Sequence, residues 1–323
     1  EIFDFIANEC DSIKDKIIED YSADKEHILA KAETGRANKY AVLALKAQAA
    51  LYHASPLFSQ GKSADEKKAL WAAAVAAHKE LIDAAEAKGM GLASDIALLW
   101  DTEYYSNAES SKEIIFARRT ASANTFEGYN FPVGYSSGQG GNCPTQDLVD
   151  AFECTDGKSI AESDLYDAAN PYANRDARLA KTVVVNGEAW HNDLEAYNSE
   201  HPVIETYIGG YHSRTGNAAG KSYATTTSYY LKKFCNPNQI LRARSGVAVT
   251  TSPHGWLTFR MGAMYLNYAE ALYQYFKASG NANAADASGS VTYKETDGTE
   301  KTISIPASQT AAKMASMTRT RSG

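Results

Sequence analysis

Apolar residues in the first part of the chain repeat at the spacing of an α-helix. One stripe consists of Leu43, Ala47, Leu51, Ala54 and Phe58. Pro56 should end or kink this helix, because proline has no backbone N–H to donate. A second helix should begin at Ser63, where Ser63-Ala-Asp-Glu66 has the capping-box pattern, and should end at Gly89. Its stripe consists of Leu70, Ala74, Ala77, Leu81 and Ala84. The two stripes predict a packed helical pair.

The pattern changes between about residues 100 and 255. Short apolar runs, such as Glu113 to Ala117 and Thr182 to Val185, predict strands, and long loops rich in Gly, Ser, Asn and Tyr separate them. Loops of this length usually carry function. Helical periodicity returns from Phe259 to Lys277. Apolar and polar residues then alternate on both sides of Asp297-Gly298, which predicts a β-hairpin. A last helix should run from Ala307 to Arg321.

Composition and charge narrow the class of protein. The 323 residues are 44% hydrophobic, which is enough for a large core. A formal net charge of −7 argues against nucleic acid as the main partner, since such a protein needs a basic surface. No apolar run has the length of about 20 residues that spans a bilayer. Because the chain starts at Glu1 inside an amphipathic helix, we interpret it as a fragment. Without a linker or sharp composition break, we expect one domain over residues 1–323, lacking an N-terminal part and the C-terminal end.

Catalytic and metal motifs are weak. Gly134-Tyr-Ser-Ser-Gly138 matches the nucleophile elbow of serine hydrolases, but the elbow requires a helix directly after the serine, and Gln139-Gly-Gly-Asn-Cys-Pro144 cannot start one. We interpret this Gly-rich run as a flexible surface loop. Cysteine and histidine spacing matches no zinc site, so we expect no metal and no cofactor. The cysteines Cys10, Cys143, Cys154 and Cys235 are compatible with free buried thiols or with two disulfides.

Five segments in a fixed order carry a family resemblance. They are GRANKYAVLALKAQAALYHASPLF (35–58), GGNCPTQDLVDAF (140–152), NRDARLAKTVVVNGEAW (174–190), YYLKKF (229–234) and WLTFRMGAMYLNYAEALYQYF (256–276). Together they resemble the SusD/RagB family of outer-membrane glycan-binding lipoproteins from Bacteroidetes. The resemblance covers most of the chain from Glu1 to about residue 276, and again from Ala307. The hairpin around Asp297 looks like an insertion between two scaffold helices.

The resemblance implies both a fold and a function. The fold is mainly α, a SusD-like α-α superhelix: a tetratricopeptide-like helical hairpin scaffold with a loop-rich face and a few short strands. The function is non-enzymatic capture of an oligosaccharide or polysaccharide at the cell surface, followed by delivery to a SusC-like TonB-dependent transporter. The lipid anchor would lie upstream of this fragment. Two alternatives stay open: a serine esterase that uses Ser136, and a helical-repeat interaction module without a small ligand.

Candidate glycan contacts come from loop aromatics, because a tyrosine ring can stack on a sugar while its hydroxyl donates a hydrogen bond. The chain has 20 Tyr, 10 Phe and 4 Trp residues. The six candidates are Tyr129, Phe131, Tyr135, Tyr211, His212 and Trp256. Of Tyr129, Phe131 and Tyr135, we expect at least one ring to be exposed, because packing against the scaffold cannot account for all three. His191, beside Trp190, could also touch ligand.

Two charged features have a structural interpretation. Glu270 lies within an apolar helical segment, so we expect a buried acid that pairs with an arginine or a backbone amide. The segment Asn174-Arg-Asp176-Ala-Arg178 should form a structural network of ion pairs.

Overall fold

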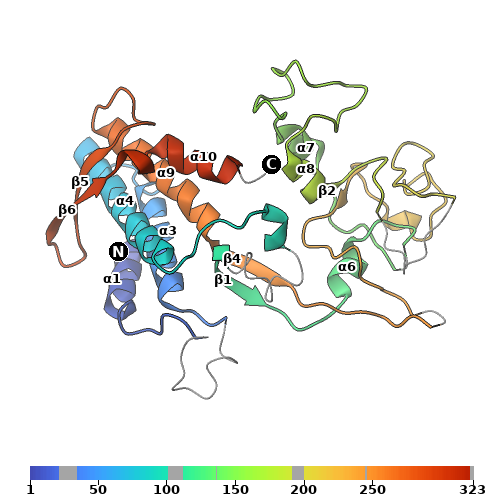
Figure 1. The fold of residues 1–323 in the computed structure, drawn as a ribbon, viewed down its shortest axis with the longest axis horizontal. Helices are drawn as coiled ribbons and strands as arrows, with labels where there is room; N and C mark the ends of the chain where they lie inside the picture. The colour runs from blue at the N-terminus through green and yellow to red at the C-terminus, as the bar shows by residue number, and fades with distance from the viewer. Residues whose placement is uncertain (22–34, 101–111, 136, 191–199, 244–245, 321–323) are drawn as a thin grey trace. The chain divides into compact units, whose positions relative to one another are not determined.

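The structure is a computed structural model, and it describes residues 1–21, 35–100, 112–135, 137–190, 200–243 and 246–320. The chain folds into two compact units. Unit 1 comprises Glu1–Ser94, Ala108–Arg118 and Trp256–Arg321, and unit 2 comprises Asp95–Asn107, Arg119–Gly255 and Ser322–Gly323. Long helices build unit 1, whereas loops and short elements build unit 2 (Figure 1).

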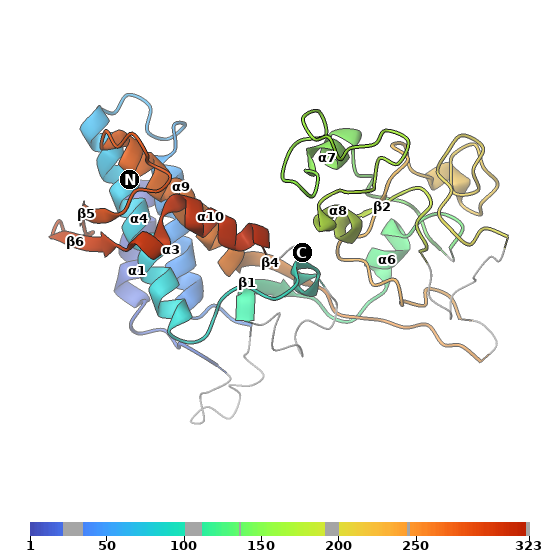
Figure 2. The ribbon, with the colours of Figure 1, turned by 45° about the horizontal axis from the view of Figure 1, so that its top comes forward.

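Unit 1 has a helical core. Its helices are α1 (Ile2–Ile13), α3 (Lys39–Ala54), α4 (Ala64–Glu86), α9 (Met261–Ala278) and α10 (Ala311–Thr320). Helix α4 packs against both α3 and α9, while α1 packs on α3 and α10 on α9 (Figure 2). Alanines at the contacts, such as Ala47, Ala74 and Ala271, are fully buried and let the helices approach closely. The predicted helical pair is therefore the centre of this unit.

Local signals set the ends of α3 and α4. The capping box is present, since Ser63 Oγ accepts from Glu66 N at 3.2 Å and Glu66 Oε2 accepts from Ser63 N at 2.7 Å. Helix α3 ends just before Ser55-Pro56, as proline requires. Because that end comes before Phe58, the prediction that Phe58 belongs to the buried stripe is wrong. Phe58 is 51% exposed, and its ring meets Phe3 edge-on at 5.0 Å.

The predicted hairpin is confirmed. Strands β5 (Gly289–Lys294) and β6 (Glu300–Ile305) pair antiparallel, and Gly298 between them takes a φ of +85°. The hairpin packs on α4 through its apolar face. The last helix begins later than predicted: residues 307–309 form the 3-10 turn η3 (Ala307–Gln309), and Thr310 is extended before α10 starts.

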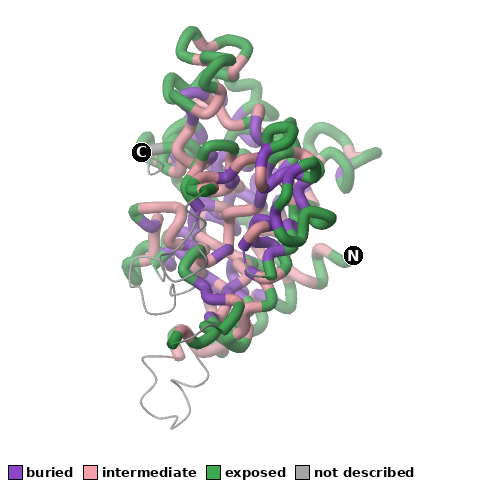
Figure 3. The backbone as a smooth tube through the Cα atoms, turned by 90° about the vertical axis from the view of Figure 1, so that its right-hand side faces the viewer, coloured by how far each residue is buried: buried purple, intermediate pink, exposed green. Residues whose placement is uncertain are grey.

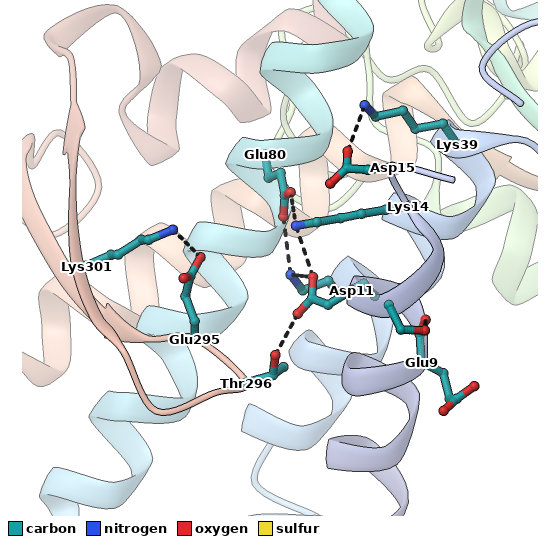
Figure 4. Close-up of polar contacts among 11 residues, drawn as sticks. Glu9, Asp11, Lys14, Asp15, Lys39, Glu80, Glu295, Thr296 and Lys301 are labelled. Atoms are coloured by element: carbon teal, nitrogen blue, oxygen red, sulfur yellow. Dashed lines mark hydrogen bonds and ion pairs between the residues drawn. The ribbon is translucent and has the colours of Figure 1, made fainter. Parts of the chain in front are cut away.

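Asp11 on α1 contacts α3 and the hairpin directly, and two lysines link it to α4 (Figure 4). Lys14 and Lys46 lie 3.0 and 2.6 Å from its Oδ1, and both lysines also pair with Glu80 on α4. Thr296 of the hairpin donates to its Oδ2 at 3.1 Å. Burial acts to raise the pKa of Asp11, but the hydrogen bonds from Lys46 and Lys14 outweigh burial and lower it.

The buried acid of unit 1 is not the predicted one. Glu270 is exposed on α9, so the prediction that it is buried is wrong. Glu113 instead is 0% exposed, directly before strand β1 (Ile114–Arg119), which pairs with β4 (Gly255–Arg260). Its carboxylate accepts from Ala93 N at 2.9 Å and from Arg260 Nη1 at 2.8 Å. A buried charge is tolerated here because it is paired and hydrogen-bonded.

The described part of unit 2 contains only short elements. They are η1 (Ile96–Leu99), α6 (Thr125–Asn130), α7 (Gln146–Ala151), α8 (Ala177–Thr182), β2 (Val183–Val184), η2 (Lys221–Tyr223) and β3 (Tyr230–Leu231). Strand β2 lies within the predicted strand and pairs antiparallel with β3. Buried residues, purple in Figure 3, are scattered along these loops, and they form a core around Phe131, Trp190 and Tyr230.

Arg175 holds the loops near α7 together. Its guanidinium is buried and donates to the carbonyl oxygens of Val149, Phe152 and Pro171 at 2.5, 2.7 and 2.9 Å. The predicted network of ion pairs is therefore only partly right. Within that segment Asp176 does pair with Arg178, but Arg175 donates to backbone carbonyls instead.

The predicted fold class, a mainly α scaffold with a few short strands, is confirmed. All four cysteines are free thiols, and three of them are buried. No described helix combines the length and apolar character needed to cross a membrane.

Candidate functional site

Only one of the three clustered aromatics presents its ring to solvent. Tyr129 is 57% exposed, whereas Phe131 is 1% and Tyr135 9% exposed. Phe131 meets Trp190 edge-on at 5.7 Å, and Tyr135 stacks with His212 at 6.0 Å. Phe131 and Tyr135 therefore belong to the core of unit 2, and Tyr129 is the member of the cluster whose side chain is open to solvent.

The prediction that Tyr129 lies in a loop is wrong, because it lies on the short helix α6. Two buried polar residues anchor this helix. Glu127 is 0% exposed, and its Oε1 accepts from His254 Nε2 at 3.0 Å and from Asn236 N at 3.1 Å. Asn130 is 2% exposed, and its side-chain oxygen accepts from the backbone N–H of Asn142, outside the helix. Tyr129 thus extends from a helix whose underside is fixed by hydrogen bonds.

The segment Gly138–Asn142, here termed the strap, runs beside α6. Gly140 N donates to Phe131 O at 2.9 Å, and Gly141 N donates to Tyr129 O at 2.6 Å. Asn142 N donates to the side-chain oxygen of Asn130 at 3.2 Å. Three consecutive amides of the strap are therefore bonded to α6 and the residue after it. The predicted loop is present, and these hydrogen bonds hold it against α6.

Tyr211 and His212 lie in a second cluster. Tyr211 is half-buried and stacks on His201, with ring centroids 4.0 Å apart. Glu205 Oε2 accepts from Tyr211 N and is 3.0 Å from His201 Nδ1, while Glu205 N donates to His212 Nδ1 at 3.1 Å. His212 is 2% exposed, so it supports the loop from beneath and does not face solvent.

The charges in this cluster follow from its burial and hydrogen bonds. Burial lowers the pKa of His212 to about 4, so its imidazole is neutral at physiological pH, consistent with Nδ1 accepting a hydrogen bond. Burial acts to raise the pKa of Glu205, but hydrogen bonds from Tyr211 N and His201 outweigh burial and lower it. Glu205 is therefore a fixed carboxylate that orders the loop.

The remaining candidates fall elsewhere. Trp256 is half-buried in strand β4 and belongs to unit 1, whereas the other five candidates belong to unit 2. His191 and Ser136 lie outside the described residues. The residues flanking Ser136 form turns, and the next described helix, α7, starts only at Gln146. A helix directly after the serine, which a nucleophile elbow requires, is thus missing from the described residues.

Sequence reasoning missed two groups of residues. The buried anchor Glu127 has no local signature, because its partners His254 and Asn236 lie more than a hundred residues away, and the half-buried Glu205 was not singled out either. The exposed aromatics Tyr207 and Tyr223 are 58% and 60% exposed. Tyr207 precedes the pair Gly209-Gly210, and Tyr223 ends η2, which follows Gly220, so nearby glycines were a usable signal. Among the described residues, no group of three or more His, Cys, Asp or Glu side chains is arranged to hold a metal ion.

The loops and short helices of this site lie within a part of the chain that matches a known protein family. Residues 100–294, more than half of the chain, match the sequence profile of the SusD family. This chain belongs to the SusD family. The resemblance noted in the five sequence segments is thereby confirmed.

Solved SusD-like structures share the fold. A SusD-like protein from Bacteroides fragilis NCTC 9343 is 22% identical, with a TM-score of 0.59 over 88% of this chain and 50% of that chain. A SusD-like carbohydrate binding protein from the same strain is 17% identical, with a TM-score of 0.61 over 99% of this chain and 54% of that chain. This SusD-family chain therefore spans about half the length of these relatives. Of the curated proteins, none matches it.

Proposed function

We propose that this SusD-family chain is part of a cell-surface protein that captures oligosaccharide or polysaccharide and delivers it to a SusC-like TonB-dependent transporter. The whole protein would form a single SusD-like domain at the outer membrane, held there by an upstream lipid anchor. It would act by binding, without turnover. Family membership supports this proposal, as does the carbohydrate-binding relative of similar fold.

The observation that carries the proposal is the placement of Tyr129. Its ring is 57% exposed on a helix whose buried face is fixed by Glu127 and Asn130. A ring held in place loses little conformational freedom when a sugar stacks on it. The apolar face of the sugar would cover the ring, and nearby amide and hydroxyl groups would bind its hydroxyls. The formal net charge of −7 agrees with a ligand other than nucleic acid.

Binding of the purified protein to a glycan array, followed by native electrophoresis through gels containing the bound polysaccharide, tests the proposal. Tyr129→Ala should weaken retardation by roughly the 0.5–1.5 kcal/mol of an aromatic contact, at an unchanged melting temperature. Tyr52→Ala is the matched control, because Tyr52 is 51% exposed on α3 of unit 1. Equal losses in both variants, or no glycan bound at all, would refute the proposal.

The esterase alternative has its own assay. If the protein cleaves a small ester and Ser136→Ala abolishes the cleavage, the serine hydrolase replaces the capture protein as the function. We expect no turnover, because the described residues on either side of Ser136 lack the helix that a nucleophile elbow needs. A glycan array without any bound glycan, together with an inactive ester assay, would favour the helical interaction module.

A further inference from the structure

Helix α1 has little apolar hold on the core of unit 1. Cys10 is the one buried residue among the 12 of this helix, whereas α3 buries nine of its 16 residues. Phe3 meets Phe58 edge-on, but Ile2 and Phe5 are 75% and 64% exposed. Elements with few buried apolar contacts open at a lower free energy than the rest of a fold. Docking of α1 therefore depends on the polar contacts near its C-terminal end.

Asp11 makes these polar contacts with both of its carboxylate oxygens (Figure 4). Its Oδ1 pairs with Lys14 and with Lys46 of α3. Its Oδ2 accepts a hydrogen bond from the Thr296 hydroxyl at 3.1 Å. Thr296 lies in the turn of the β5–β6 hairpin, 285 residues farther along the chain. The turn of the hairpin is thus bonded directly to α1.

The hairpin presents Thr296 from a fixed turn. Glu295 N donates to Thr299 O at 2.8 Å, which closes the turn around Thr296. In the two strands, Val291 and Ile305 are 0% and 1% exposed and belong to the same core as α4. A hydroxyl group on such a support loses little conformational freedom when it donates to α1.

The chain that follows α1 is attached separately. Lys39, at the start of α3, donates its N–H to Ile18 O at 3.0 Å, and the Tyr40 hydroxyl donates to Glu19 Oε1 at 2.9 Å. Both contacts lie beyond Ile13, the last residue of α1, and neither involves the hairpin. An undocked α1 would therefore stay tethered at Ile18, which confines the opening to the helix and the few residues after it.

We propose that the hairpin is a latch on α1. The contact between Thr296 and Asp11 keeps α1 docked, and its loss releases α1 as a hinged arm while α3, α4 and α9 stay folded. Undocking uncovers the thiol of Cys10, which is 4% exposed in the docked state, together with the surface of α3 on which α1 packs. The latch is independent of the proposed capture of glycans.

The rate at which Cys10 reacts with a maleimide measures the opening. Burial raises the pKa of this thiol, so the docked form is unreactive and labelling reports the undocked form. The folded protein is incubated with excess reagent in native buffer, and labelled peptides are quantified by mass spectrometry. Thr296→Val keeps the shape of the side chain but removes the hydroxyl, so Cys10 should react roughly two- to tenfold faster.

Two controls separate the latch from general loss of stability. Thr292→Val is the same substitution on the same hairpin, but the hydroxyl of Thr292 bonds to that of Thr302 at 2.9 Å and not to α1. It should leave the labelling of Cys10 unchanged. The thiol of Cys154 in unit 2 is 2% exposed, and it should react at the same rate in every variant.

A double-mutant cycle tests whether the effect of Thr296 acts through Asp11. Asp11→Ala should speed the labelling of Cys10, because it removes the lysine pairs as well as the hydrogen bond. Adding Thr296→Val to Asp11→Ala should then change nothing, since the acceptor is already absent. An equal acceleration by Thr296→Val in the presence and in the absence of Asp11 would show that the two residues are not coupled, and the latch would be wrong.

Three other results would also overturn the latch. The first is that Cys10 reacts equally fast in Thr296→Val and in the unmodified protein. The second is that Thr292→Val accelerates labelling as much as Thr296→Val, because the stability of the hairpin, and not the contact of its turn, would then control α1. The third is that Cys154 accelerates together with Cys10, which would mean that the whole chain unfolds and α1 does not open by itself.

Discussion

His78, in the middle of α4, should make the folded chain sensitive to acid. Its side chain is 0% exposed, and Nδ1 donates to Ala74 O at 2.8 Å. The other ring nitrogen, Nε2, is buried without a hydrogen-bond partner among the described residues. Burial lowers the pKa of His78 from 6.5 to about 4, because a proton on Nε2 would place a charge in the apolar core.

The sign and size of the effect follow from proton linkage. The pKa of His78 in the folded chain lies below the unfolded value of 6.5, so the unfolded chain binds more protons at mildly acidic pH. The contribution of His78 to stability is therefore complete above pH 6.5 and is lost as the pH falls toward 4. Between pH 7 and pH 5 the free energy of unfolding should decrease by about 2 kcal/mol because of this residue.

Urea denaturation followed by circular dichroism at pH 7 and pH 5 measures this loss. In His78→Met the decrease between the two pH values should be smaller by about 2 kcal/mol, because methionine carries no titratable group. Leu81→Met is the matched control, since Leu81 is also 0% exposed on α4 and its replacement should shift stability equally at both pH values. The same pH dependence in His78→Met and in the unmodified protein would refute the reasoning.

Three further predictions concern stability. Phe131→Ala should destabilise unit 2 by about 3–5 kcal/mol, because Phe131 is a core residue at 1% exposure, and a drop in melting temperature below a few degrees would contradict this. Glu113→Gln should destabilise unit 1 by about 1.5–3 kcal/mol, because it removes the charge-assisted hydrogen bond from the partly exposed Arg260. Urea unfolding measures the loss, and an unchanged free energy of unfolding would contradict this. Arg175→Met should leave buried carbonyl oxygens unpaired, at about 1–3 kcal/mol each, and should speed proteolytic cleavage between Val149 and Pro171, whereas unchanged cleavage would mean that other contacts hold these loops.

The helical scaffold was predictable because its signals are local. A capping box at Ser63, a proline at position 56 and the Asp297-Gly298 turn each act within a few residues, and each produces the predicted boundary. The start of the last helix was missed, because Pro306 and Thr310 hold the backbone extended on both sides of a 3-10 turn.

The site was only partly predictable, because burial there depends on distant parts of the chain. The sequence GYNFPVGY contains three aromatics of similar character, and nothing local shows that Phe131 and Tyr135 turn inward while Tyr129 turns outward. The same limit applies to the acids. Glu270 looked buried from its apolar neighbours, yet the buried carboxylates among the described residues are Glu113 and Glu127. Their side-chain partners, Arg260 and His254, lie 147 and 127 residues away in the sequence.

The discontinuity of unit 1 has a consequence for the order of folding. Helix α4 is complete at Glu86, but α9, the helix that covers one of its faces, starts at Met261. The main segment of unit 2, Arg119–Gly255, is made entirely in between. Unit 2 can therefore fold while the face of α4 that α9 later covers is still open. Contacts between segments that are far apart in sequence form late in folding. We therefore expect the packing of α9 against α4 to limit the overall rate of folding.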